Sequence, residues 1–371
     1  MHNLKQIQVA LNTNFYDRRE EIDALLIALL SRQHVLFIGP AGTGKSALSS
    51  MLGKVVKDSA YFQHLLTPFS MPEELFGVLS LKDLEQGIYK RNMKDMLPEA
   101  HFAFVDEIFK ANASILNSLL TLINERVYYN NGVPVQSPLM TIVGSSNEYI
   151  EEGEGLEALF DRFLLRYEVN YIREQTSFIS MLKGVQHVSV PQITLDELMI
   201  HQVRVEALNV PEEVFETLAM IRQQLQDEGI RPSDRRFKQS ISLLKARAYL
   251  EGRTSVVLGD LKILGASLWE TIDQKEKTIE IILHHAQDPV ESFMERCRLE
   301  FEEVIQNADK YSQGSDEKAQ KMIQELMVKG KTLVLDIETM QQQYPNRTEL
   351  EQLRKDMRDR LVKMTAAVIG F

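Results

Sequence analysis

The stretch Gly39-Pro-Ala-Gly-Thr-Gly-Lys45-Ser46 decides the fold of this chain. It follows a short apolar run, His34–Ile38, and precedes a helical pattern that opens at Ala47. Glycines allow positive φ angles, so several backbone N–H groups of such a loop can turn toward one anion. The N-terminus of the following helix adds partial positive charge at the same place. Strand, loop and helix together predict a phosphate-binding loop inside an α/β sheet.

The residues of this loop have predicted roles in binding ATP and Mg²⁺. We expect Lys45 to reach the β- and γ-phosphates and the Ser46 hydroxyl to bind Mg²⁺. The other positions bring main-chain N–H groups close to phosphate oxygens. The predicted nucleotide-binding set is Gly39, Pro40, Ala41, Gly42, Thr43, Gly44, Lys45, Ser46 and Ala47.

Two carboxylates, Asp106 and Glu107, end the apolar run His101–Val105. Asp106 is expected at the carboxyl edge of the sheet, beside the phosphate loop, where it can hold the Mg²⁺ shell. Glu107 is then free to orient and deprotonate an attacking water. Two adjacent acids could instead simply begin a solvated helix, but the phosphate loop upstream favours the catalytic interpretation. A kinase places its acceptor where that water would lie, so the pair favours hydrolysis.

A polar residue follows a third apolar run. Leu139–Val143 leads into Gly-Ser-Ser-Asn147, and a side chain at the tip of a neighbouring strand can touch the γ-phosphate or its water. Asparagine is also a common turn residue. Its catalytic role therefore depends on the other two motifs.

The apolar runs outline three domains. Runs at residues 34–38, 60–66, 101–105, 139–143 and 163–171 are typical of strands buried on both faces, with helical stretches between them. Residues 1–187 are thus predicted to form a parallel α/β sheet with helices on both faces. Residues 188–286 show helical patterns alone and predict an all-helical lid. Heptad-like stripes predict a C-terminal bundle of three long helices over residues 287–371.

Composition narrows the class of partner and the compartment. A net charge of −11 argues against broad nucleic-acid binding, which needs a positive face, and favours a protein partner. The single cysteine, Cys297, excludes an internal disulfide. No apolar run approaches the roughly 18 residues of a membrane span, and the N-terminus has no signal-peptide pattern. We expect a cytoplasmic protein that does not insert into membranes.

Taken in order, the phosphate loop, Asp106-Glu107, Asn147 and a downstream Asp161-Arg162-Phe163 resemble AAA+ ATPases. Three further segments resemble the MoxR family, and more narrowly its RavA-like branch: Ser70-Met-Pro-Glu-Glu-Leu-Phe76-Gly77, Leu97-Pro-Glu-Ala100 and Asp106-Glu-Ile-Phe-Lys-Ala111. The resemblance covers about residues 8–250. It implies Mg²⁺-dependent ATP hydrolysis by a hexameric ring that chaperones or remodels a protein. The partner in this family is commonly a protein with a von Willebrand factor A domain.

The resemblance also assigns roles to residues outside the loop. The region Tyr16-Asp17-Arg18 falls where the family borders the adenine, and Tyr16 and Asp17 are the two residues expected to line that site. Arg162 falls where an arginine reaches the γ-phosphate of the neighbouring subunit, with Arg166 as the alternative. A lid arginine contacts the γ-phosphate of its own subunit, and in Pro232-Ser-Asp-Arg-Arg-Phe237 the apolar positions that follow favour Arg236 over Arg235.

Two insertions fit the same group of ATPases. Strand formers flank Asn131-Gly132 and predict a hairpin over residues 127–135. Residues 70–95 hold the second insertion, and Phe76 within it could face the ring's central opening or belong to the core. The RavA-like relative also carries a small β-domain in its helical C-terminal part, for which the short linkers here leave no room.

Two other functions are alternatives to the remodelling of a protein partner. Related AAA+ groups with the same hairpin drive helicases, so a motor that translocates nucleic acid is the alternative, and the acidic balance argues against it. A nucleotide-dependent scaffold that barely hydrolyses ATP has little support, because Glu107, Asn147 and Arg162 are all present.

Overall fold

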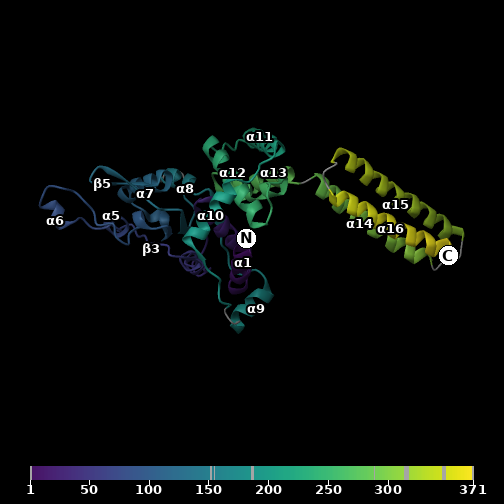
Figure 1. Cartoon of the computed structure of the whole chain (residues 1–371), viewed down its shortest axis with the longest axis horizontal. Coiled ribbons are helices and arrows are strands. Elements are labelled where there is room, and N and C mark those ends of the chain that lie inside the picture. The colour runs from purple at the N-terminus through teal and green to yellow at the C-terminus, as the bar shows by residue number, and fades with distance from the viewer. Residues whose placement is uncertain are drawn as a thin grey trace. The chain divides into compact units, whose positions relative to one another are not determined.

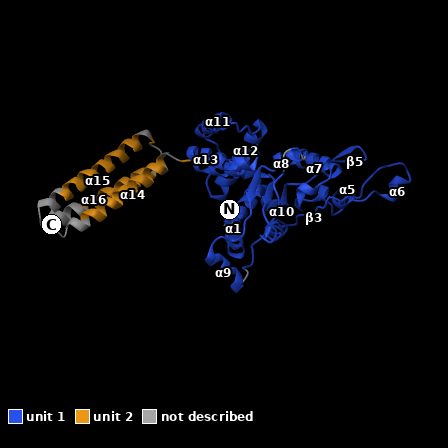
Figure 2. Ribbon diagram, turned by 180° about the vertical axis from the view of Figure 1, so that it is seen from behind, with its two compact units in different colours: residues 1–286 blue, residues 287–371 orange. Residues whose placement is uncertain are grey.

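The computed structural model describes residues 2–369 except 151, 152, 154, 185–187, 288, 313–316 and 345–347. The chain forms two compact units, residues 1–286 and 287–371 (Figure 2). The first unit contains both the sheet and the helices predicted as a lid. A separate domain boundary near residue 187 falls outside the described residues and stays a prediction.

A five-stranded parallel sheet lies at the centre of the first unit (Figure 1). Its strand order is β3-β4-β7-β1-β8, and each neighbouring pair is parallel. Because β7 lies between β1 and β4, the residues that follow these three strands meet at one edge of the sheet. The strands are β1 (Val35–Ile38), β3 (Tyr61–Leu65), β4 (Phe102–Asp106), β7 (Thr141–Ser146) and β8 (Leu165–Glu168).

Both faces of the sheet are buried. Val35 and Phe37 of β1 pack into one hydrophobic cluster, while Leu36 and Ile38 pack into another. Successive strand residues point to opposite faces, so a continuous apolar run is what a strand covered on both sides requires. The predicted fold class, a parallel α/β sheet with flanking helices followed by a helical lid and C-terminal helices, is confirmed.

Short connections and helices surround the sheet (Figure 1). A second, two-stranded parallel pair is formed by β2 (Val56–Lys57) and β9 (Ile193–Thr194). The helices are α1 (His2–Asn14), α2 (Arg19–Ser31), α3 (Lys45–Ser49), α4 (Met51–Val55), α5 (Pro72–Phe76), α6 (Leu81–Leu84), η1 (Leu97–Glu99), η2 (Ile108–Lys110), α7 (Ala113–Glu125), α8 (Glu157–Arg162) and α9 (Gln175–Lys183).

The two insertions are joined to each other. The predicted hairpin is present as the antiparallel strands β5 (Val127–Asn130) and β6 (Val133–Gln136). Asn130 donates to the Arg91 carbonyl oxygen (3.0 Å) and accepts from the Arg91 N–H (2.8 Å). Phe76 is buried and stacks on Tyr128, with ring centroids 5.3 Å apart. Phe76 is therefore a core residue that fastens one insertion to the other.

The helical part of the first unit packs on the sheet domain through α2. It comprises α10 (Leu195–Glu206), α11 (Glu212–Asp227), α12 (Asp234–Leu250), η3 (Leu258–Ala266) and α13 (Ile272–His285). Both α10 and α12 contact α2, and residues from all three belong to one hydrophobic cluster. This shared core explains why sheet and lid form a single compact unit.

The second unit consists of α14 (Pro289–Ser312), α15 (Glu317–Gln343) and α16 (Thr348–Ile369). Each helix contacts the other two, and apolar residues such as Phe301, Ile337 and Met357 fill their own core. A Cβ at Gly330 would lie 2.5 Å from Leu361 Cδ1, so glycine there allows α15 and α16 to approach closely.

Candidate active site

The phosphate loop runs from Gly39 to Gly44, between β1 and α3. A Cβ at Gly39 would lie 2.3 Å from the Val169 carbonyl oxygen. Gly42 and Gly44 have φ angles of 79° and 87°, which residues with a Cβ rarely adopt. Gly39 is therefore required because the Val169 backbone lies too close for a side chain. Gly42 and Gly44 are required because of their positive φ angles.

Lys45 opens α3, and its side chain folds back into the loop. Its ammonium group donates to the carbonyl oxygens of Gly39 (2.5 Å) and Pro40 (2.9 Å) and to Asn147 Oδ1 (3.1 Å). Burial lowers the pKa of Lys45, and the two carboxylates that end β4 oppose this shift. Negative charge arriving in the loop would further favour the charged ammonium.

Asp106 is held by its neighbours with one carboxylate oxygen left toward the loop. Its Oδ1 accepts from the buried Ser145 hydroxyl and from the Glu107 N–H (3.1 Å). Its Oδ2 accepts from the Ser46 hydroxyl (3.4 Å). Carboxylate and hydroxyl oxygens are ligands that Mg²⁺ uses in nucleotide sites. Ser46 and Asp106 therefore fit a shared Mg²⁺ beside the phosphates.

Glu107 lies directly after β4 in a conformation unusual for its residue type. Its φ of 52° and ψ of 46° are left-handed, and non-glycine residues there are strained and often functional. Its carboxylate accepts from Asn147 Nδ2 and lies 3.6 Å from the Lys110 ammonium. Asn147 thus touches both Lys45 and Glu107, which brings the three predicted motifs into one hydrogen-bonded group.

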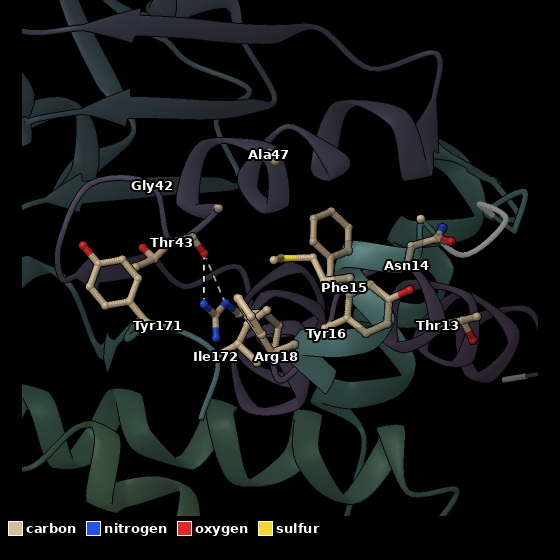
Figure 3. Close-up of a pocket in the computed structure, with 14 residues that line it drawn as sticks. Thr13, Asn14, Phe15, Tyr16, Arg18, Gly42, Thr43, Ala47, Tyr171 and Ile172 are labelled. Carbon is tan, nitrogen blue, oxygen red and sulfur yellow. Dashed lines mark hydrogen bonds between the residues drawn. The ribbon is translucent and has the colours of Figure 1, made fainter. Parts of the chain in front are cut away.

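A cavity of about 560 Å³ opens beside the loop (Figure 3). Three segments from distant parts of the chain line it: the end of α1 with the residues after it, the phosphate loop, and the chain from β8 into α9. Its lining is Thr13, Asn14, Phe15, Tyr16, Arg18, Gly42, Thr43, Gly44, Ala47, Tyr171, Ile172, Phe178, Met181 and Gly184. Aromatic and aliphatic side chains next to a phosphate loop suit a nucleobase.

The two residues predicted to border the adenine differ in position. Tyr16 lines the cavity. Asp17 instead turns to the chain leading into α9, where its Oδ2 accepts from the Arg173 N–H (2.9 Å). Phe178 and Met181 of α9 also line the cavity, and the sequence reasoning missed them. Their exposed, helically spaced apolar side chains were the available signal.

The predicted interface arginine lies in a cluster that includes both lid candidates. Asp161 accepts from Arg235 through Oδ2 and from Arg236 through Oδ1 (3.4 Å). Arg162 Nη1 lies 3.8 Å from the same carboxylate. Neither Arg235 nor Arg236 belongs to the described lining of the cavity beside the phosphate loop. The contact of a lid arginine with the γ-phosphate of its own subunit stays a prediction.

Burial distinguishes the alternative arginines. Arg236 is 2% exposed and donates to the carbonyl oxygens of Ser267 (2.6 Å), Asp161 (2.9 Å) and Phe163 (2.8 Å). The side chain of Arg235 is 35% exposed. Arg236 therefore joins the lid to the sheet domain, and burial favours the alternative, Arg235, as the lid arginine that a ligand could reach.

Arg166 is also enclosed. It is 2% exposed, donates to the carbonyl oxygens of Phe163 (3.1 Å) and Trp269, and lies 4.0 Å from the centre of the Phe160 ring. Such a guanidinium cannot reach another subunit without leaving the core. Arg162, whose side chain is 23% exposed, is the better candidate for that role.

Ser145 is a further site residue that the sequence reasoning missed. It lies near the carboxyl end of β7, fully buried, and its hydroxyl donates to Asp106 Oδ1. A buried hydroxyl needs a partner, so a serine inside an apolar strand was a signal that could have been followed. The fold and this group of residues define a P-loop nucleotide-binding protein of the AAA+ class.

Comparisons with known proteins place the chain within that class. Residues 2–209 match the family model described as the MoxR domain in the MoxR-vWA-beta-propeller ternary systems, and residues 213–282 match an AAA lid domain. The chain belongs to the MoxR family of AAA+ ATPases. Among the described residues, none forms a helix long and apolar enough to cross a membrane.

Similar proteins include two uncharacterized proteins of Methanocaldococcus jannaschii. MJ0079 is 39% identical over 74% of this chain and 72% of its own length, and MJ0812 is 40% identical over 73% and 72%. The chaperone MoxR1 of Mycobacterium tuberculosis is 26% identical over 46% of this chain and 45% of its own. A crystal structure of a candidate ATPase from Cytophaga hutchinsonii has the same fold, with a TM-score of 0.63, 16% identity, and coverage of 76% of this chain and 94% of that one.

Proposed function

We propose that this protein is a Mg²⁺-dependent ATPase that works in a hexameric ring to remodel or chaperone a protein partner. One observation carries the catalytic part of this proposal. Lys45, Ser46, Asp106, Glu107 and Asn147 end or follow three neighbouring strands and meet at one sheet edge, beside a cavity large enough for a nucleoside. Family membership supports nucleotide binding.

Each residue has a distinct part in the proposed hydrolysis. The loop N–H groups and Lys45 bind the phosphates, and Ser46 with Asp106 holds the metal, which would supply charge neutralisation on the phosphate oxygens. Glu107 accepts the proton of the attacking water. Asn147 orients that water or the γ-phosphate, after exchanging its bonds to Lys45 and Glu107 for the ligand.

The ring is proposed because Arg162 falls where the resemblance places an arginine that reaches the γ-phosphate of the neighbouring subunit. Arg162 and Arg235 share one carboxylate, Asp161. A phosphate of the neighbouring subunit would give both a second anionic partner. The RavA-like branch remains part of this proposal, supported by the Ser70–Gly77 and Asp106–Ala111 segments and by three long C-terminal helices.

A protein partner fits the family better than nucleic acid does. The matched family model describes ternary systems of MoxR, vWA and β-propeller components, and the mycobacterial relative is a chaperone. A von Willebrand factor A domain protein is therefore the proposed partner, in the cytoplasm. The net charge of −11 favours this reading over the alternative of a nucleic-acid motor.

Two variants test the catalytic proposal. Lys45→Ala should abolish binding of a fluorescent ATP analogue, because the loop would lose the buried ammonium group that folds back into it. Glu107→Gln should bind the analogue as the wild type does but release no phosphate. Lys54→Ala, an exposed lysine on α4, serves as the control. Wild-type binding by Lys45→Ala would place the nucleotide elsewhere.

A further inference from the structure

Arg18 is a buried cation at the phosphate loop to which the proposed chemistry gives no role. It precedes α2, is 7% exposed and lines the cavity beside the loop. Figure 3 shows its guanidinium directed at Thr43, with two hydrogen bonds to that residue. A buried guanidinium beside Thr43 therefore needs a structural or functional explanation.

Within the described part of the chain, the Arg18 side chain donates its hydrogen bonds to main-chain carbonyl oxygens. Nε and Nη2 both donate to Thr43 (3.3 and 3.0 Å), Nη2 also to Asn170 (2.5 Å), and Nη1 to Asp17 (2.6 Å). The nearest carboxylate, Glu21, lies at 3.9 Å. The planar guanidinium fork therefore fixes backbone from three segments that are up to 152 residues apart in sequence.

The hydrogen bonds from Arg18 to the Thr43 carbonyl oxygen also orient the N–H group on the other side of the same peptide. A trans peptide is planar, and its C=O and the N–H of the next residue point in opposite directions. Fixing the Thr43 carbonyl therefore fixes the direction of the Gly44 N–H. In a phosphate loop, such N–H groups cradle the phosphate oxygens.

Little else restrains this peptide. Gly44 has no side chain, and a Cβ built there would meet nothing within 4 Å. Its φ of 87° is available mainly to glycine, whose peptide units rotate more freely than those of other residues. The Thr43 hydroxyl donates to Pro40 (3.0 Å), which orders the threonine side chain but leaves its carbonyl to Arg18.

We propose that Arg18 is a positioning residue that turns the Thr43–Gly44 peptide so that its N–H faces the nucleotide phosphates. Arg18 acts through the backbone of the loop and on the phosphate part of the ligand. The base and ribose, which meet the apolar side of the cavity, do not depend on it. The inference rests on the nucleotide site proposed above and adds a residue that prepares it.

Comparing ADP with adenosine, which lacks phosphates, tests this role in the full chain. Dissociation constants are measured by calorimetry for ADP and by saturation-transfer NMR for adenosine. Arg18→Gln should weaken ADP binding about 10- to 100-fold, the range for hydrogen bonds to a charged group, and leave adenosine within about twofold. Arg18→Lys should lose nearly as much, because an ammonium keeps the charge but not the planar fork. Arg19→Gln, its exposed neighbour, is the control.

The outcomes separate this inference from the proposed function. If ADP does not bind the wild type, the nucleotide site itself is wrong. If the wild type binds ADP and Arg18→Lys binds it equally well, the orienting role is wrong. An equal loss of ADP and adenosine in Arg18→Lys would also overturn it, since that result indicates general damage to the cavity. Should Arg18→Gln not fold, the lysine variant decides alone.

Discussion

The phosphate-loop edge of the sheet and the arginine cluster at Asp161 are both highly charged, yet they are built differently. At the sheet edge, a cation, two carboxylates and an amide are already hydrogen-bonded to one another around a place for phosphate. At Asp161, three guanidinium groups share one carboxylate. The first region needs only nucleotide and metal. In the second, among the described residues, one carboxylate lies within 4 Å of three guanidinium groups.

This difference explains why one subunit is expected to be a poor ATPase. The sheet edge supplies the base and the metal ligands but no arginine among the described residues that touch the loop's phosphate side, apart from the backbone-bound Arg18. The arginine cluster at Asp161 supplies guanidinium groups, but the nucleotide is proposed to bind at the sheet edge. Joining the two across the proposed subunit interface would complete both, and the following predictions test that interface from the largest effect to the smallest.

Arg162→Ala should have the largest effect on turnover. An arginine supplied by a neighbouring subunit is worth about 10³–10⁵ in rate, so phosphate release should fall by that factor while the affinity for ATP stays the same. Steady-state phosphate release and equilibrium binding measure the two quantities. Normal turnover in this variant would show that the cluster has no part in hydrolysis.

The neighbouring lid arginines should separate function from stability. Arg235→Ala should lower turnover about 10²-fold, the usual cost of removing one charge-stabilising donor, with little change in melting temperature. Arg236→Ala removes a buried ion-pair partner and should destabilise the fold by about 3–5 kcal/mol. Thermal unfolding and ATPase rates of both variants check this. If the two arginines exchanged these effects, the assignment from burial would be reversed.

Ser145→Ala should have a smaller effect, confined to the metal. The hydroxyl bond to Asp106 restrains that carboxylate, and its loss should raise the Mg²⁺ concentration for half-maximal ATP-analogue binding about tenfold. Thr141→Val is the matched control, because Thr141 is another buried hydroxyl of β7, bonded to the Ala28 carbonyl oxygen (3.2 Å). An equal shift in both variants would indicate a disturbed strand instead.

Removing the C-terminal unit should have the smallest effect on nucleotide binding. Residues 287–371 have a core of their own, and the site residues all lie before Ala286. A protein that ends at Ala286 should bind ADP within about twofold of the full chain, as calorimetry would show. Loss of binding in a folded truncated protein would mean that the C-terminal helices support the site.

Local patterns in the sequence predicted the parallel sheet and the residues at its phosphate-loop edge. The loop, the strand ends and the hairpin are each encoded by a few contiguous residues, so apolar runs and glycines identify them. Arg18 and Ser145 could not be placed in this way. Two partners of Arg18, Thr43 and Asn170, lie 25 and 152 residues away, and the partner of Ser145 lies 39 away, so only packing brings these segments together.

The choice between Arg235 and Arg236 shows the same limit in more detail. Of the apolar positions that favoured Arg236, Leu244 is buried, while Phe237 and Ile241 are half-buried against the same hydrophobic cluster. The same packing engages Arg236 in the core and leaves Arg235 half-exposed. Periodicity gives the face of a helix, but it does not say which face the ligand will approach.

Mixing two inactive variants tests the central claim, that hydrolysis requires the two regions from different subunits. Arg162→Ala keeps an intact Glu107, and Glu107→Gln keeps an intact Arg162. In a ring of both, some interfaces join the intact sheet edge of one subunit to the intact arginine of the next. We therefore expect phosphate release at fixed total protein to exceed that of either variant alone and to peak at intermediate ratios. Activity equal to the weighted sum of the two variants at every ratio would contradict the account.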